Sequence, residues 1–321
     1  MEYSIDYFSA AVETALQNLT FPAVAPKLFE PVRYTLESGG KRLRPVLLLA
    51  VYTALSRRDI SEAMNQALGI EIFHNFTLLH DDVMDNADLR RGRPTVHRRW
   101  NQSTAILSGD AMLTYASMLT CACPADRLAA VNACFNETAM GVYEGQQFDM
   151  EFERRNNVTV AEYLDMIRLK TSVLLAGACA IGAIMADADA ETRRRLYDYG
   201  VALGIAFQLR DDWLDTYGDP AVFGKEIGGD IVNRKKTWLL ITALEESDGE
   251  LTDILREDLS DHELIAQVRR VYDRLNLSIR CCELAESYSQ KAVEALGGVE
   301  MDADARRFFT GLAQKASTRL H

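Results

Sequence analysis

The chain has 321 residues, of which 48% are hydrophobic and 26% are charged, and its formal net charge is −12. These proportions are typical of a soluble globular protein with a substantial core. The negative charge argues against a general nucleic-acid binder, which needs a basic surface. Glycine and proline are sparse, at 19 and 7 residues, which favours long helices over a loop-rich β architecture.

The cysteines and the first residues indicate a reduced, cytoplasmic protein. The six cysteines lie in apolar helical patterns without C-x-x-C spacing or companion histidines, which favours buried thiols over a zinc site or disulfides. The start of the chain contains Glu2 and Asp6 and lacks an apolar run, unlike a signal peptide. Apolar runs such as Pro45 to Leu55 are shorter than the ~20 residues that cross a bilayer, so we expect no stable membrane anchor.

Apolar residues recur at helical spacing along most of the chain. The pattern predicts helices over residues 5–19, 28–36, 46–55, from a cap at 59 or 61 to an acidic cluster at 81–85, 103–119, 125–152, 160–185, 190–216, 237–246, 261–275, 278–296 and 302–320. Pro31 is tolerable only in the first turn of its helix. No stretch alternates like a strand and no low-complexity linker divides the chain. We therefore predict one all-α domain spanning residues 1–321.

Two copies of the pattern Asp-Asp-x-x-Asp lie in apolar surroundings. They comprise Asp81, Asp82 and Asp85, and Asp211, Asp212 and Asp215. On a helix the first and last aspartates of each cluster lie one turn apart, with Cβ atoms ~6 Å from each other, and they repel unless a cation sits between them. Their carboxylate oxygens are suitable ligands for a hard divalent cation, and Mg2+ is the first candidate. One such cluster alone is as readily a solvated helix face or a cap; two of them favour a metal site.

Each acidic cluster is followed by a basic loop. Arg90 and Arg91 follow the first cluster, and Lys225 and Lys235 follow the second. Carboxylates that hold Mg2+ beside arginine and lysine donors can bind a diphosphate from several sides. Such a site neutralises charge as a diphosphate departs, and the expected product of that step is a carbocation.

Two other groups of basic residues need an explanation. Lys41, Arg42 and Arg44 follow two glycines, and they form either a second anion site or solvated charges at a helix start. Lys170 interrupts an apolar helix. A buried ammonium is unfavourable there unless an anion is close, and a bound diphosphate would supply one.

Together these motifs resemble the trans-isoprenyl diphosphate synthases, the farnesyl and geranylgeranyl diphosphate synthase family. Besides the two clusters, the resemblance rests on Gly39-Gly40-Lys41-Arg42-Leu43-Arg44-Pro45, Arg90-Arg91-Gly92, Lys170-Thr171, Gln208 and Lys225. It implies a single large all-α bundle around a deep central cavity, usually in a homodimer. It also implies a Mg2+-dependent prenyltransferase that joins isopentenyl diphosphate head to tail to dimethylallyl, geranyl or farnesyl diphosphate and gives an all-trans product.

The resemblance assigns a role to each matching residue. Metal binding falls to Asp81, Asp85 and Asp211, with about three Mg2+ ions per active site and with support from Asp82, Asp212, Asp215 and Asp230. The residues that bind the allylic diphosphate are Arg90, Lys170, Lys225 and Lys235, and Arg234 and Lys236 are alternatives to Lys235. The residues that bind isopentenyl diphosphate are Gly40, Lys41, Arg44, His74 and Arg91. The catalytic residues are Lys170, Thr171 and Gln208, of which Thr171 and Gln208 line the reacting carbons. On its own, His74 is as readily a core histidine.

Residues before the first cluster bear on product length. In the family that the chain resembles, large side chains just before the first cluster form the floor of the product tunnel. The corresponding positions in this chain are Phe73, Phe76 and Thr77. An aromatic side chain at Phe76 implies a short product, C15 or C20. Ideal helix geometry turns Phe76 about 140° from Asp81, so this role assumes a bend or an oblique tunnel. The alternative is that Phe73 and Phe76 are simply core.

Two alternative functions share much of this chemistry. A class I terpene cyclase ionises the same substrates, but usually carries an Asn/Ser/Glu motif in place of the second cluster and lacks the second basic pocket. A non-catalytic subunit of a heteromeric synthase generally loses one or both clusters. This chain keeps both clusters together with Lys41 and Arg44, which favours the synthase.

Overall fold

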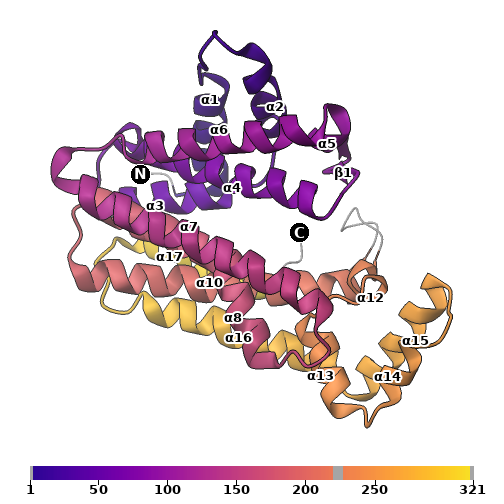
Figure 1. Ribbon diagram of the computed structural model, residues 1–321. Helices are drawn as coiled ribbons and strands as arrows, with labels where there is room; N and C mark the ends of the chain where they lie inside the picture. The colour runs from indigo at the N-terminus through magenta and orange to yellow at the C-terminus, as the bar shows by residue number, and fades with distance from the viewer. Residues whose placement is uncertain (1–2, 220–226, 319–321) are drawn as a thin grey trace. The chain divides into compact units, whose positions relative to one another are not determined.

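Helices make up most of residues 3–219 and 227–318, which the computed structural model describes (Figure 1). The predicted all-α class is confirmed. The described residues divide into two units. Unit 1 comprises residues 3–137, 177–196 and 299–305, and unit 2 comprises residues 138–176, 197–219, 227–298 and 306–318. The single domain over residues 1–321 stays a prediction.

The elements follow one another in the order that Figure 1 labels. They are α1 (Ile5–Gln17), α2 (Pro26–Leu36), α3 (Leu43–Ser56), the 3-10 turn η1 (Ile60–Ala63), α4 (Met64–Met84), β1 (Leu89–Arg90), β2 (Arg93–Pro94), α5 (Val96–Arg99), α6 (Gln102–Thr120), α7 (Ala125–Arg154), α8 (Val160–Ile167), the π-helical turn η2 (Arg168–Ser172), α9 (Val173–Met185), α10 (Ala190–Tyr217), α12 (Gly229–Val232), α13 (Trp238–Glu246), α14 (Glu250–Ile254), α15 (Asp261–Arg274), α16 (Leu277–Ala295) and α17 (Ala303–Thr318).

In unit 1 the central helix is α4. It packs along α6 and against α3, and α1, α2 and α5 also contact it. Because it is covered on several sides, α4 buries polar residues such as Glu71 and Asn75 as well as Phe73. Helix α3 is apolar on all sides and is buried from Pro45 to Ala54. These contacts hold the end of α4, where the first acidic cluster lies.

In unit 2 the short helices α13, α14 and α15 lie together beside α16 (Figure 1). Helix α13 contacts α8, α14, α15 and α16, and α12 contacts α15. Their apolar faces form one core that includes the fully buried Leu239, Val268 and Leu277. This core supports α8 and the segment around α12, which both contribute residues to the site described below.

The structure differs from the predicted elements at the second helix and after the first acidic cluster. Helix α2 begins at Pro26 instead of Leu28, because proline is well suited to the first helical position. Pro31 therefore lies beyond the first turn, where it cannot donate to the carbonyl of Lys27. The predicted loop over residues 86–94 contains the β1–β2 pair, with Arg90 opposite Arg93. Two-residue strands are too short to show an alternating pattern.

The predicted helix over residues 160–185 is three consecutive elements, α8, η2 and α9. The stretch Val160–Met185 is long and apolar enough to cross a membrane by length and composition, and 78% of its most apolar window is buried inside the protein. It is therefore a core segment of this fold. The interruption at η2 coincides with the Lys170-Thr171 motif.

Candidate active site

The first acidic cluster lies at the C-terminal end of α4. Asp82 is 5% exposed and accepts a hydrogen bond from Nε of Arg90 at 2.6 Å. Burial raises the pKa of Asp82, and Arg90 opposes that rise. Asp81 is half-buried and Asp85 is exposed at the C-cap, where its N–H donates to the carbonyl of Asp81. The middle aspartate therefore binds Arg90, and Asp81 and Asp85 lie one turn apart.

The second acidic cluster, on α10, is arranged in the same way. Asp212 is 3% exposed and accepts hydrogen bonds from Nε2 of Gln208, at 2.9 Å, and from the hydroxyl of Tyr163. Burial raises the pKa of Asp212. Asp211 and Asp215 are half-buried, and a carboxylate oxygen of Asp215 accepts the N–H of Asp230 at 2.8 Å. In both clusters the middle aspartate is held by protein donors, while the outer two are more accessible.

Lys170 and Thr171 lie in the π-helical turn η2, a local widening of the helix that is frequent at functional sites. Two glycines allow neighbouring helices to approach this turn. A Cβ on Gly145 would lie 2.2 Å from the backbone nitrogen of Lys170, and one on Gly204 would lie 2.5 Å from Cα of Ser172. The turn is thus packed between α7 and α10. This turn was not predicted from the sequence, in which Gly145 and Gly204 are its nearest signal.

A chain of hydrogen bonds joins two predicted catalytic residues, Thr171 and Gln208, to Asp212. The hydroxyl of Thr171 donates to Oε1 of Gln208 at 3.1 Å, and the amide of Gln208 donates to Asp212. Tyr163 donates to the other carboxylate oxygen of Asp212. Because Gln208 accepts through its oxygen and donates through its nitrogen, its orientation is determined by these two partners. Tyr163 was not among the residues predicted from the sequence.

These residues surround a cavity of about 60 Å³ in unit 2. Its lining consists of Asp149, Tyr163, Met166, Ile167, Lys170, Thr171, Gln208, Asp212 and Lys235. The ammonium of Lys170 lies 2.5 Å from a carboxylate oxygen of Asp149. The expected anion near Lys170 is therefore present as Asp149, a residue that the sequence analysis missed.

Lys235 is the member of its basic run that reaches this cavity. Its ammonium lies 3.6 Å from Oδ1 of Asp230. Burial raises the pKa of Asp230 to about 7, and nearby Asp212 and Asp215 add to the rise that Lys235 opposes. This geometry favours Lys235 over Arg234 for the predicted role. Lys225, also assigned to the allylic diphosphate, lies outside the described residues.

In unit 1 the predicted isopentenyl diphosphate residues form two neighbouring pairs. A Cβ on Gly40 would lie 3.0 Å from the guanidinium of Arg91, which donates to the carbonyl of Gly39. Nη1 of Arg44 lies 3.1 Å from Nε2 of His74. Arg91 also contributes to the lowered pKa of Arg44, whose main cause is burial. Lys41, next to Gly40, is exposed.

The arginine contact defines the state of His74. A guanidinium can only donate, so Nε2 of His74 accepts and the neutral ring carries its proton on Nδ1. Burial and the charge of Arg44 hold the pKa of His74 well below its usual value. Within the described residues, the buried Nε of Arg44 has no hydrogen-bond partner. His74 and Arg44 are therefore a polar pair and not isolated core residues.

Arg42 departs from both sequence-based interpretations of the basic segment. It is 3% exposed, and its guanidinium is bonded to Glu13 and Glu71. Arg42 is therefore neither an open anion site nor a solvated charge. Its neighbour Lys41, in contrast, is exposed.

The residues assigned to product length lie on the buried part of α4. Phe73 is fully buried, and its ring centroid is 5.4 Å from that of Phe135. Phe76 is 6% exposed and packs edge-on against His80 at 4.7 Å. Thr77 is half-buried and donates to the carbonyl of His74. Phe73 thus belongs to the core of unit 1, whereas Phe76 lies nearer its edge.

The donor chemistry of the clusters suits magnesium. Within residues 3–219 and 227–318, no group of three or more His, Cys, Asp or Glu side chains is arranged to hold a metal ion by itself. The outer aspartates offer hard carboxylate oxygens, and Mg2+ typically takes one or two carboxylates and completes its shell with water and substrate phosphates. The residues therefore fit Mg2+ bound together with a diphosphate.

A protein-family model described as Polyprenyl synthetase matches residues 25–275. The chain belongs to this family. The predicted resemblance is confirmed, and the protein is a prenyltransferase of isoprenoid biosynthesis. Among the relatives of the chain, the geranylfarnesyl diphosphate synthase of Natronomonas pharaonis is 38% identical over 264 residues, which are 77% of each chain.

Solved structures of the family agree with this assignment. A crystal structure of a geranylgeranyl pyrophosphate synthase has a TM-score of 0.93 and 39% identity, and the match covers 99% of each chain. The geranylgeranyl pyrophosphate synthase of Corynebacterium glutamicum, complexed with isoprenyl diphosphate and magnesium, has a TM-score of 0.87 and 26% identity; the match covers 98% of this chain and 99% of that one.

Proposed function

We propose that this prenyltransferase condenses isopentenyl diphosphate with an allylic diphosphate and releases diphosphate and an all-trans prenyl diphosphate. The observation that carries the proposal is the cavity of unit 2, where four predicted residues meet: Lys170, Thr171, Gln208 and Asp212. The paired Arg44–His74 and Gly40–Arg91 contacts of unit 1 supply the separate basic site that a second diphosphate needs.

Magnesium is the proposed cofactor, with three ions per active site as the family resemblance implies. We assign Asp81 and Asp85 in unit 1, and Asp211 and Asp215 in unit 2, as its ligands. The relative from Corynebacterium glutamicum, crystallised with magnesium, supports this choice. Bound Mg2+ would neutralise the charge that develops on the departing diphosphate.

The middle aspartates have a different proposed role. Asp82 holds Arg90, and Asp212 holds Gln208 and Tyr163. Each therefore orients donors beside the outer aspartates of its own cluster. We assign Asp82 and Asp212 as supporting residues, which hold these donors in place and are not themselves metal ligands.

The cationic side chains bind the allylic substrate. Lys170, Lys235 and Arg90 donate to its diphosphate, together with Lys225 by resemblance. Before substrate binds, Lys170 is paired with Asp149, and this contact keeps the ammonium compensated in a partly buried position. The diphosphate replaces or joins that carboxylate as the partner of Lys170.

The walls of the cavity protect and stabilise the allylic cation. Met166 and Ile167 are apolar and buried, and they exclude water that would quench a cation. The oxygen dipoles of Thr171 and Gln208 provide fixed partial negative charge beside it. The alkene of isopentenyl diphosphate attacks the cation, and the departing diphosphate accepts the proton that is lost.

Isopentenyl diphosphate keeps its diphosphate, so its pocket binds without ionising it. Arg44, Arg91 and Lys41 provide the positive charge of this pocket. Because Arg44 has an unused buried N–H, an incoming phosphate oxygen would satisfy it. Neutral His74 adds polar contact without adding another cation.

Geranylgeranyl diphosphate, C20, is the proposed main product. It lies within the range expected from the aromatic residue at Phe76, and the structural relative named geranylgeranyl pyrophosphate synthase supports it. The relative from Natronomonas pharaonis makes C25 the nearest alternative. The place of Phe76 on α4, five residues before Asp81, supports a role in limiting product length.

We also propose a cytoplasmic homodimer. Helix α6 of unit 1 carries large apolar side chains that are strongly exposed, and Leu107 and Met118 are 60% and 61% exposed. Burying them against a second copy would remove apolar surface from water. Light scattering coupled to size exclusion should give twice the monomer mass.

A substrate panel tests the proposed function. Purified protein is incubated with Mg2+, isopentenyl diphosphate and dimethylallyl, geranyl or farnesyl diphosphate in turn, and products are sized by chromatography. We expect C20 diphosphate from each. A hydrocarbon formed without consumption of isopentenyl diphosphate would favour a terpene cyclase. Absence of diphosphate release from every allylic substrate would contradict the enzyme and favour a non-catalytic subunit.

A further inference from the structure

We propose that Arg42 is a positioning residue that holds the isopentenyl diphosphate pocket in its binding geometry. This inference rests on the proposed function, because it concerns the pocket formed by Gly40, Lys41, Arg44 and Arg91. Arg42 does not contact substrate in this proposal. It acts by joining the segment that carries these residues to the surrounding helices.

Three strong contacts occupy the guanidinium of Arg42. Its Nε donates to Glu13 of α1, its Nη1 to Glu71 of α4, and its Nη2 to the carbonyl of Leu36, each at 2.7 Å. Leu36 is the last residue of α2, so this bond satisfies a carbonyl at a helix end and places a cation beside it. One side chain thus ties together α1, α2 and α4.

The backbone of Arg42 caps the start of the next helix. It is the residue before α3 and has a left-handed conformation, with φ of 48°. Gly39 and Gly40 also have positive φ angles, of 74° and 137°. A non-glycine residue in this conformation is strained, and the contacts of the buried guanidinium provide the compensation. Arg42 therefore fixes the turn that presents Gly40 to Arg91.

The charges around Arg42 separate it from the arginines assigned to substrate. Glu13 and Glu71 offset the charge of Arg42, and Asn75 donates a further bond to Glu71 at 2.9 Å. Across the described residues, Arg44 and Arg91 form no ion pair with a carboxylate. The guanidinium groups of Arg44 and Arg91 thus stay available for a diphosphate, whereas that of Arg42 is committed to structure.

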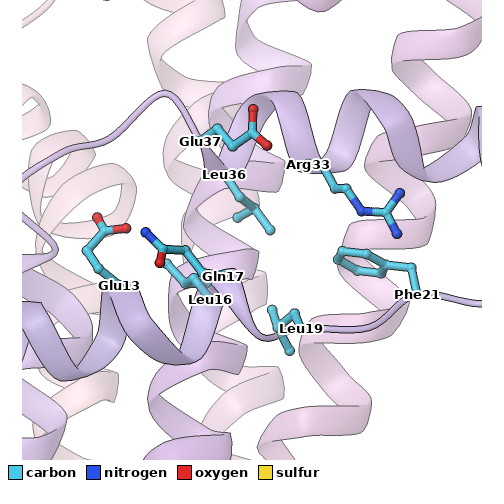
Figure 2. A pocket seen from close by; sticks show the side chains of 8 residues that line it. All are labelled: Glu13, Leu16, Gln17, Leu19, Phe21, Arg33, Leu36 and Glu37. Carbon is cyan, nitrogen blue, oxygen red and sulfur yellow. The ribbon is translucent and has the colours of Figure 1, made fainter.

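Glu13 offers a mild way to perturb this contact. Its side chain is 38% exposed, and it lines an open cavity of about 270 Å³ between α1 and α2 (Figure 2). Figure 2 shows Glu13 of α1 and Leu36 of α2 among the side chains that line this cavity, and the backbone carbonyl of Leu36 accepts from Arg42. Truncating Glu13 therefore leaves no fully buried cavity, whereas truncating the buried Glu71 would leave one.

Steady-state kinetics on the full chain test the inference, with the two substrates varied separately. Arg42→Gln should raise the KM for isopentenyl diphosphate about tenfold and change the KM for farnesyl diphosphate less than about twofold. Glu13→Ala should raise the isopentenyl KM about threefold. Glu13→Gln keeps an acceptor for Nε of Arg42 and should return the value close to wild type.

A matched control is Arg58→Gln, because Arg58 is 55% exposed and pairs with Glu62. It should leave both KM values unchanged. The inference is overturned if Glu13→Ala and folded Arg42→Gln keep the wild-type isopentenyl KM, or if both KM values rise in parallel with a loss of thermal stability. In those cases wild-type turnover still upholds the proposed function. Wild-type protein that consumes no isopentenyl diphosphate would instead overturn both.

Discussion

At the scale of single residues, Asp82 and Asp212 differ from the outer aspartates of their clusters in burial. Each is buried and bonded to donors of its own unit. A repeated Asp-Asp-x-x-Asp pattern does not distinguish these roles, because all three aspartates have the same side chain. The distinction depends on partners elsewhere in the chain. Tyr163, for example, is 49 residues from Asp212.

Tyr163→Phe tests the role of the hydroxyl on Asp212. The substitution removes one donor to a buried carboxylate, and hydrogen bonds to charged groups contribute about 1.5–3 kcal/mol. We expect kcat to fall about tenfold, with helix content unchanged by circular dichroism. Tyr217→Phe is the matched control, since Tyr217 donates to Asp273 at the surface. Equal activity of wild type and Tyr163→Phe would show that Gln208 alone suffices to orient Asp212.

His74 gives a prediction for stability as a function of pH. Its pKa in the folded protein is well below the usual value, mainly through burial and also through Arg44. Below pH ~6.5 the unfolded chain binds a proton that the folded chain does not, so stability falls by up to about 1.4 kcal/mol per pH unit. His74→Gln should make this fall shallower between pH 6.5 and 5 in urea denaturation. Identical slopes would contradict the assignment of a neutral His74.

At the scale of elements, the turn η2 shows what close packing adds to a helix. Its five residues carry Lys170 and Thr171 and lie between Gly145 and Gly204. The widened turn changes where both side chains point relative to an uninterrupted helix. Helix packing therefore contributes directly to the geometry of the candidate active site.

Gly204→Ala tests this packing. A Cβ there would lie 2.5 Å from Cα of Ser172, and overpacking of this kind typically costs about 1–3 kcal/mol. We expect lower stability in chemical denaturation and lower kcat, because η2 must move. Gly311→Ala, in α17 of the same unit, is the control, since nothing lies within 4 Å of the added atom. If Gly204→Ala matched Gly311→Ala in both measurements, close packing at η2 would not matter.

The elements also show how far sequence could predict the fold and site. Long helices such as α7 and α10 were predictable because apolar spacing is a local signal. The π turn was not, because Val160–Met185 is apolar nearly all round and an inserted residue leaves no change in its pattern. The role of Arg42 was also hidden. Its partners Glu13 and Glu71 each lie 29 residues away, and only the fold brings them together.

At the scale of the whole molecule, each unit contributes one acidic cluster and one basic group. Unit 1 carries Arg44, His74 and Arg91 with the first cluster, and unit 2 carries Lys170 and Lys235 with the second. Prenyl transfer requires two diphosphates to be bound differently, one to leave and one to stay. The basic residues of unit 1 and those of unit 2 therefore offer two different ways of binding a diphosphate.

Product length is a property of the whole enzyme that one residue is expected to control. Phe76→Ala removes an aromatic ring near the edge of the core of unit 1, so we expect products longer than those of the wild type by one or more C5 units. Phe135→Leu is the control, because it changes a buried aromatic that also packs against Phe73. An unchanged product distribution in Phe76→Ala would assign the floor of the tunnel to another residue.

The central claim is that both acidic clusters serve one Mg2+-dependent prenyl transfer. The most direct test is the turnover of isopentenyl and farnesyl diphosphate by Asp81→Ala and Asp211→Ala, with Asp88→Ala and Asp253→Ala as controls at exposed positions. We expect each cluster variant to lose turnover by at least about a thousandfold with wild-type helix content, and the controls to remain active. Full activity of either cluster variant would contradict the claim.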